Sequence, residues 1–217
     1  MLSDPDYRVQ TKICGLTRLE DARFASGALA DFLGFIAWPG SPRFIPADKV
    51  KEIINWVHGP KTVAVFVNQP LDDVNEYVAA SGVQMIQLHG DESPAYISLL
   101  DKPVIKAFGI SSGMSRTDIE AMVAPYADSV AYVLFDTSVD GRSGGTGTAF
   151  DWDLLIDIEL GVPFFVSGGL DASNVTEVME RVAPLGVDAS SRLEVSPGVK
   201  DLGKIRDFFE SIESMYP

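Results

Sequence analysis

Cysteine is almost absent from this sequence: Cys14 is the single one among 217 residues, so no disulfide can form within the chain. The two histidines lie far from it in sequence, which leaves no familiar zinc-binding spacing, and we predict no metal site. No run of about 18 apolar residues is available to span a membrane. The stretch from Met1 to Gln10 carries charges before any apolar run, unlike a signal peptide. We therefore expect a cytoplasmic protein that does not engage a membrane.

Positive charge is also scarce. Seventeen basic residues against 31 acidic ones give a net charge of −14, which disfavours binding to nucleic acid or to an anionic surface. A phosphorylated ligand would need local hydrogen-bond donors in such a chain, and backbone N–H groups at helix N-termini are suited to that task. A phosphate site in this chain is therefore expected at a glycine-rich helix start.

Short β-branched or aromatic runs alternate with longer amphipathic stretches from one end of the chain to the other, which is typical of repeated βα units. Division of the length by eight gives about 27 residues per unit, enough for a strand, a short helix and two loops. We predict one α/β domain over residues 1–217, a single (β/α)8 TIM barrel. The expected strands are Val9 to Cys14, Phe32 to Ile36, Thr62 to Val67, Met85 to Leu88, Val104 to Phe108, Tyr132 to Phe135, Phe164 to Ser167 and Val187 to Ser190.

Helices are expected to begin at residues that cap or open helices. The least supported is the sixth, because Trp152 to Ile158 is short and is followed by Gly161 and Pro163. An open, doubly wound sheet is the alternative, but the residues after the first strand are not its glycine fingerprint. The expected starts are Thr17, Pro46, Pro70, Ser93, Ser115, Asp151, Asp171 and Asp201.

Two groups suited to proton transfer follow predicted strands, where barrel enzymes carry their chemistry. Cys14 stands beside Lys12, a cation that could favour its thiolate, although a lone cysteine in an apolar strand is often just a small buried hydrophobe. Asp136 follows an apolar run, and desolvation would raise its pKa and suit it to donating a proton near neutral pH. A turn or cap role for Asp136 is the alternative.

Other strand ends carry groups suited to binding. Gly168 and Gly169 follow the seventh strand and Ser190 and Ser191 the eighth, the two loops between which barrels commonly hold a phosphate. Arg43 in the second loop could pair with a carboxylate or simply be solvated. His89 could line the site or be a hydrogen-bonded strand-end residue. The segment 141–147, rich in glycine, is expected to form either a mobile lid or a plain loop.

Taken together and in their order along nearly the whole chain, these segments resemble those of the phosphoribosylanthranilate isomerase family. The resemblance rests on Lys12-Ile13-Cys14-Gly15, Ser41-Pro42-Arg43, Gln87-Leu88-His89-Gly90, Phe135-Asp136-Thr137, Gly144-Gly145-Thr146-Gly147 with Phe150-Asp151-Trp152, Gly168-Gly169-Leu170, and Val187-Asp188-Ala189-Ser190-Ser191 followed by Pro197-Gly198 and Lys200-Asp201.

The resemblance implies an Amadori rearrangement of N-(5-phosphoribosyl)anthranilate, without a cofactor, by a monomer or homodimer. It implies that Asp136 is the general acid that opens the ring and that Cys14 is the general base at C2. It places the phosphate near Gly168, Gly169, Ser190 and Ser191, and the anthranilate carboxylate on Arg43. The positions that match substrate-binding parts of the family motifs also include His89 and Asp188.

One position departs from the family pattern: Arg192 stands where a glycine is expected in the phosphate loop. If that position needs positive φ, an arginine there is strained; otherwise Arg192 could add a charged contact to phosphate. Two alternatives follow. One is a barrel that binds a phosphorylated ligand without turnover, and the other is a related sugar-phosphate isomerase, in which an aspartate would be expected in place of Cys14.

Overall fold

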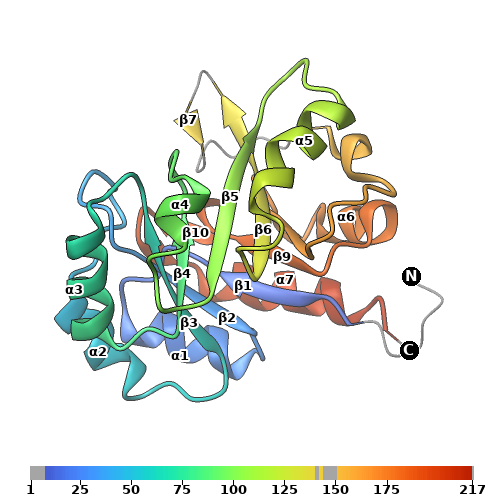
Figure 1. The fold of residues 1–217 in the computed structure, drawn as a ribbon. Helices are drawn as coiled ribbons and strands as arrows, with labels where there is room; N and C mark the ends of the chain where they lie inside the picture. The colour runs from blue at the N-terminus through green and yellow to red at the C-terminus, as the bar shows by residue number, and fades with distance from the viewer. Residues whose placement is uncertain (1–7, 140–141, 144–150, 217) are drawn as a thin grey trace.

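The computed structural model describes residues 8–139, 142–143 and 151–216. Its central feature is a closed barrel in which eight strands pair in parallel, each with its neighbour in chain order, and the last returns to the first (Figure 1). The barrel strands are β1 (Gln10–Ile13), β2 (Phe32–Ile36), β3 (Lys61–Phe66), β4 (Met85–Leu88), β5 (Val104–Ile110), β6 (Tyr132–Val139), β8 (Phe164–Val166) and β9 (Gly186–Ala189). The predicted (β/α)8 barrel and all eight of its strands are confirmed.

Helices surround this barrel, with α1, α2 and α3 on one flank and α5 and α6 on the other (Figure 1). Proline or serine precedes several of them, as the sequence predicted. The helices are α1 (Leu19–Gly27), α2 (Ala47–Ile54), α3 (Leu71–Ser81), α4 (Pro94–Ile97), α5 (Arg116–Val123), α6 (Val175–Val182) and α7 (Leu202–Glu213), with short 3-10 turns η1 (Ala124–Tyr126), η2 (Trp152–Leu155) and η3 (Ser191–Leu193). Short antiparallel pairs are formed by β7 (Arg142–Ser143) with β6, and by β10 (Glu194–Ser196) with β11 (Val199–Lys200).

Two expected helices differ from the prediction. The sixth is only the 3-10 turn η2, because the chain turns left-handed at Asp157 and again at Gly161, and a right-handed helix cannot continue through such residues. The next helix begins at Val175 rather than near Asp171. Asp171 instead closes a turn, since its side chain accepts from the Ser173 N–H and its own N–H donates to Asn174 Oδ1.

An apolar layer fills the inside of the barrel. Its centre is a group of three rings, in which Phe165 meets Phe32 and Tyr132 edge-on at centroid distances of 5.4 Å. Val63, Met85, Ile105, Ala107 and Leu134 complete the layer. Because side chains alternate between the two faces of a strand, a residue two positions after a layer member also points inward. Polar residues such as Gln87, Asp136 and Ser167 follow layer members by two positions, and they form part of the candidate site.

A larger apolar cluster lies between the outer faces of the strands and the helices, and it includes Ile13, Phe35, Phe66, Val178 and Phe208. Among the residues with described positions, no helix is both long and apolar enough to cross a membrane.

Candidate active site

A buried ion pair joins the neighbouring strands β1 and β9 inside the barrel, next to the apolar layer. Lys12 Nζ lies 3.0 Å from Asp188 Oδ1, and both side chains are almost wholly buried. The Ser167 hydroxyl donates to the other Asp188 oxygen at 3.4 Å. Burial alone would lower the pKa of Lys12. The combined effect of Asp188 and Cys14 is larger and opposite, so the pKa of Lys12 is raised. Lys12 is therefore a fixed cation beneath the mouth of the barrel.

Cys14 directly follows β1, two residues after Lys12, and is 6% exposed. Burial raises the pKa of its thiol, while Lys12 acts in the opposite direction without cancelling that effect. The sequence predicted that Lys12 would favour the thiolate. Lys12 does act to lower the pKa of the thiol, as expected. The net pKa shift is nevertheless upward, because burial desolvates the thiol more than a strand-end position suggested. In the ligand-free protein Cys14 is therefore a thiol.

Gly34 makes room for this thiol. A Cβ atom at position 34 would lie 2.7 Å from Cys14 Sγ, closer than real contacts allow, and 3.1 Å from Cys14 Cα, which is tight. Gly34→Ala should therefore displace the thiol and lower kcat by roughly ten- to a hundredfold, the scale of a misplaced reacting group. Gly27→Ala is the matched control, since nothing lies within 4 Å of an added Cβ there. Equal kcat values for the two variants would show that the position of Cys14 Sγ does not matter.

Asp136 projects inward from β6 and is 5% exposed. Its Oδ1 accepts the backbone N–H of Thr137 at 2.8 Å, and its Oδ2 lies 3.5 Å from His89 Nε2. Burial, with a further contribution from Asp188, raises its pKa to about 7. The predicted desolvation of this carboxyl group is confirmed, and Asp136 lies within a strand rather than in a turn.

His89 follows β4, and its backbone N–H donates to Phe66 O at 2.9 Å. Its ring is partly buried, and burial together with the cations Lys12 and Lys106 lowers its pKa to about 4. The ring is thus neutral near pH 7. Sequence reasoning missed its neighbour Gln87, an inward-facing residue of β4 whose amide nitrogen lies 3.3 Å from His89 Nδ1.

Arg43 is held by a carboxylate that the sequence did not single out. Its guanidinium forms a two-pronged pair with Glu194, through Nε at 2.8 Å and Nη2 at 2.7 Å. Lys200 Nζ lies 3.0 Å from the same carboxylate and also donates to Ser190 O at 3.0 Å. Gly15 has φ +76, and a Cβ there would meet Arg43 Cδ at 2.7 Å. Arg43 is therefore a fixed cation at the mouth and not a solvated surface residue.

The two loops expected to hold phosphate lie after β8 and β9. Gly168 and Gly169 have φ +91 and +69, and a Cβ at Gly168 would meet Thr137 Oγ1 and lie 2.8 Å from the Thr137 nitrogen, so a side chain there would collide with β6. In the other loop Ser190 Oγ donates to Cys14 O at 3.0 Å, and Ser191 opens η3. The first loop is thus packed against the strand of Asp136 and the second against Cys14.

Arg192 lies within η3 and does not adopt positive φ, so the possibility of backbone strain at this position is excluded. Its Nη1 donates to Asp171 Oδ2 at 2.8 Å, which joins the loop after β9 to the loop after β8. The expected lid at 141–147 falls mostly outside the described residues; within it, Arg142 and Ser143 pair with β6.

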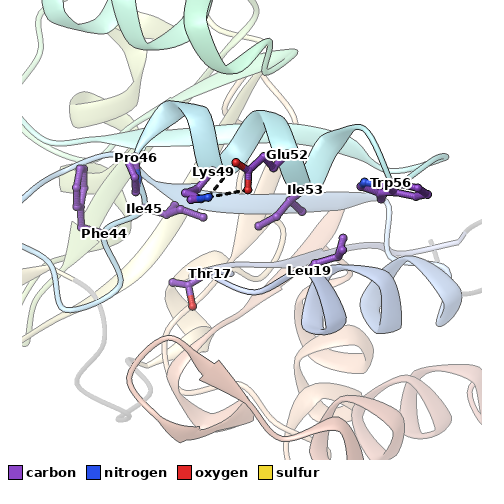
Figure 2. A pocket seen from close by; sticks show the side chains of 9 residues that line it. All are labelled: Thr17, Leu19, Phe44, Ile45, Pro46, Lys49, Glu52, Ile53 and Trp56. Carbon is purple, nitrogen blue, oxygen red and sulfur yellow. Dashed lines mark hydrogen bonds and ion pairs between the residues drawn. The ribbon is translucent and has the colours of Figure 1, made fainter.

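Two surface grooves lie outside the mouth of the barrel, and one of them is lined by Ser191, Arg192 and Asp171. The other, of about 500 Å³, runs along the outside of the barrel between α1 and α2, with Phe44, Ile53 and Trp56 on its wall beside the exposed pair Lys49–Glu52 (Figure 2). Within the described parts of the chain, no three His, Cys, Asp or Glu residues gather closely enough to hold a metal ion.

The fold and these groups define the class of protein: a (β/α)8 barrel of the kind whose chemistry takes place at the carboxyl ends of its strands. The family model for N-(5′-phosphoribosyl)anthranilate isomerase matches residues 11–211. The enzyme of that name from Nitrosomonas eutropha is 39% identical over 208 residues, which covers 95% of this chain and 98% of the relative. The chain belongs to the N-(5′-phosphoribosyl)anthranilate isomerase family, and it is an isomerase of the aldose–ketose, intramolecular oxidoreductase type.

Solved structures agree with this assignment. A phosphoribosyl anthranilate isomerase in complex with reduced 1-(o-carboxyphenylamino)-1-deoxyribulose 5-phosphate has a TM-score of 0.83 and 30% identity, covering 95% of this chain and 99% of that one. Monomers generated from the dimeric enzyme of Thermotoga maritima give 0.82 and 31%, with the same coverage.

Proposed function

We propose that this protein converts N-(5′-phosphoribosyl)anthranilate into 1-(2-carboxyphenylamino)-1-deoxyribulose 5-phosphate in tryptophan biosynthesis, with Asp136 as general acid and Cys14 as general base. The observation that carries the proposal is the pairing of two buried proton-transfer groups at one barrel mouth, one a carboxyl group with a pKa of about 7 and the other a thiol beside a fixed cation. These groups stand on β6 and β1, and β8 and β9 lie between those strands.

We propose that the reaction begins with a proton from Asp136 and proceeds through Cys14. Asp136 gives its proton to the furanose ring oxygen, the C–O bond breaks, and the ring opens to an iminium. Cys14 first loses its proton to solvent and then, as thiolate, takes the C2 proton. The resulting enolamine becomes the ketone when C1 gains a proton and the C2 hydroxyl group loses one. The sugar carbons are reduced and oxidised internally, so no external oxidant or reductant is needed, and we propose that no cofactor takes part.

For binding, we propose that Arg43 pairs with the anthranilate carboxylate. Its guanidinium is fixed by Glu194, so little conformational freedom is lost when substrate arrives. We propose that Gly168, Gly169, Ser190 and Ser191 receive the phosphate, and that His89 and Asp188 line the substrate. We further propose a single cytoplasmic domain over residues 1–217, either a monomer or a homodimer, with no metal, membrane or nucleic-acid partner.

The identity of the product tests this proposal against ligand binding without turnover. After incubation with freshly prepared substrate, the proposal predicts a compound of unchanged mass with a ketone carbon at C2 in its NMR spectrum. Recovery of the substrate unaltered, although bound, would establish the barrel as a binding protein.

Arg192 gives a second prediction. We propose that its guanidinium adds a charged contact to phosphate. Arg192→Ala should then weaken binding of a phosphorylated product analogue about tenfold, the lower end of what a charged hydrogen bond provides, because the side chain is partly exposed. Binding of the dephosphorylated analogue should be unchanged, as measured by calorimetry. Arg181→Ala is the control, since Arg181 also pairs with exposed carboxylates. An equal loss for both analogues would show that Arg192 does not contact the phosphate.

A further inference from the structure

When the Asp136 carboxyl group is neutral, one of its two oxygens carries the proton. Oδ1 already accepts the Thr137 N–H at 2.8 Å, and a hydrogen-bonded acceptor oxygen is the less favourable place for a proton. The proton of the carboxyl group therefore belongs to Oδ2. Oδ2 is the oxygen that faces His89 Nε2, at 3.5 Å.

The ring of His89 holds only one proton. Burial, Lys12 and Lys106 lower its pKa to about 4, so near neutral pH either Nδ1 or Nε2 is protonated, but not both. Because Nε2 has no hydrogen-bond partner among the described residues, the tautomer is decided at Nδ1. The group that faces Nδ1 is the amide nitrogen of Gln87, at 3.3 Å.

In this orientation of the Gln87 side chain the amide NH₂ faces Nδ1 and can only donate, so Nδ1 accepts from it and the ring proton is left on Nε2. Gln87 is 1% exposed and lies within β4, so solvent does not compete for its amide. The ring proton then points at Asp136 Oδ2. The distance of 3.5 Å is long for a hydrogen bond, and such contacts commonly shorten when substrate is bound.

The backbone on either side of the ring is fixed from outside the barrel. Lys106 Nζ lies 3.1 Å from Glu92 Oε2 and also donates to Gly90 O. The two Glu92 oxygens accept the backbone N–H groups of Gly90 and Asn68. These bonds hold the backbone next to the His89 ring in place.

We propose that Gln87 is a positioning residue that acts through His89: its amide holds neutral His89 as the Nε2–H tautomer, and this N–H stabilises the Asp136 carboxylate formed when the acid gives up its proton. The inference rests on the proposed role of Asp136. The proton that opens the ring comes from Asp136 Oδ2, while the Nε2 proton stays on the ring and donates to the new carboxylate. The charged and titratable groups around His89 and Asp136 are Lys12 of β1, Lys106 of β5, Asp188 of β9, and Glu92, which lies between β4 and α4.

The tautomer can be read directly. The chain has only two histidines, and His58 is exposed, so ¹⁵N-histidine NMR gives two ring spin systems that His58→Gln assigns. The wild-type protein should show His89 with a protonated Nε2 and an unprotonated Nδ1. The opposite tautomer would overturn the proposal without any variant of Gln87. That tautomer would overturn the role of Gln87 even if the protein converts the substrate as proposed. Failure of this inference is therefore distinguishable from failure of the proposed function.

Kinetics supply the second measurement. Gln87→Met keeps the length of the side chain and removes the amide, and we expect kcat to fall about tenfold with KM nearly unchanged. The Asp136 carboxylate would lose a donor, so the break of the kcat/KM profile near pH 7 should move to higher pH. Ionisation of the substrate phosphate is common to both proteins and cancels in the comparison.

Gln69→Met is the control, because the Gln69 amide donates to Ala37 O instead and should leave the break in place. In a His89→Leu background, Gln87→Met should have no further effect on the break, since Gln87 acts through the ring. An unchanged tautomer and an unmoved break in Gln87→Met would overturn the proposal. A purely structural role would lower stability without moving the break.

Discussion

Cys14→Ser is expected to lower kcat at least about 100-fold, the usual size of a lost general base. A serine hydroxyl at the end of β1 would occupy nearly the same space as the thiol but is a far poorer base. Affinity for a product analogue should stay similar, because the Lys12–Asp188 pair and Arg43 are untouched. Steady-state kinetics and calorimetry with the same preparations give both values, and a variant with near wild-type kcat would remove Cys14 from the mechanism.

Asp136→Asn is expected to abolish most turnover, because an amide cannot supply the proton that opens the ring. Asn keeps an oxygen for the Thr137 N–H and has nearly the same shape, so the fold should survive. Substantial retained turnover would rule out Asp136 as the acid.

The same substitution should stabilise the protein at neutral and alkaline pH. A carboxyl group whose pKa rises from 3.8 to about 7 on folding favours the folded state only while it is protonated. That contribution is complete below about pH 4 and is lost as the pH rises through 7. Above pH 7, Asp136→Asn should therefore exceed the wild type by up to a few kcal/mol in the free energy of unfolding. Urea denaturation at pH 4 and pH 8 measures the difference, and greater stability together with lost turnover separates chemistry from misfolding.

The strands were predictable because each is a short apolar run that must be buried on both faces, as in β3 and β5. The barrel followed from their even spacing. Helix bounds were less predictable where local turns compete with the helix, as Asp157 shows after η2 and Asn174 before α6. These turns depend on side chains that also serve ordinary loops, so apolar periodicity alone did not reveal them.

The candidate site was predictable in its residues but not in their partners. Cys14, Asp136 and Arg43 stand at strand ends or in the following loops, which the alternation of elements locates. Lys12 and Asp188 are 176 residues apart, and nothing in the local sequence pairs them. Glu194 on Arg43 and Gln87 beside His89 are contacts of the same kind, made only when the barrel closes.

The state of Cys14 could not be predicted either, because its pKa depends on a balance. Lys12 next to it in the sequence indicated a thiolate, whereas the burial that raises the pKa depends on how tightly Gly34 and the neighbouring strands enclose the sulfur. The extent of desolvation is a property of the packed barrel and not of the local sequence.

Single-turnover conversion of freshly prepared N-(5′-phosphoribosyl)anthranilate, with protein in excess and loss of substrate fluorescence as the signal, tests the central claim most directly, because excess protein removes differences in affinity. The account predicts rapid loss of fluorescence with the wild type and little above the solution rate with Cys14→Ser or Asp136→Asn. Loss by either variant at the wild-type rate, or none by the wild type itself, would contradict it.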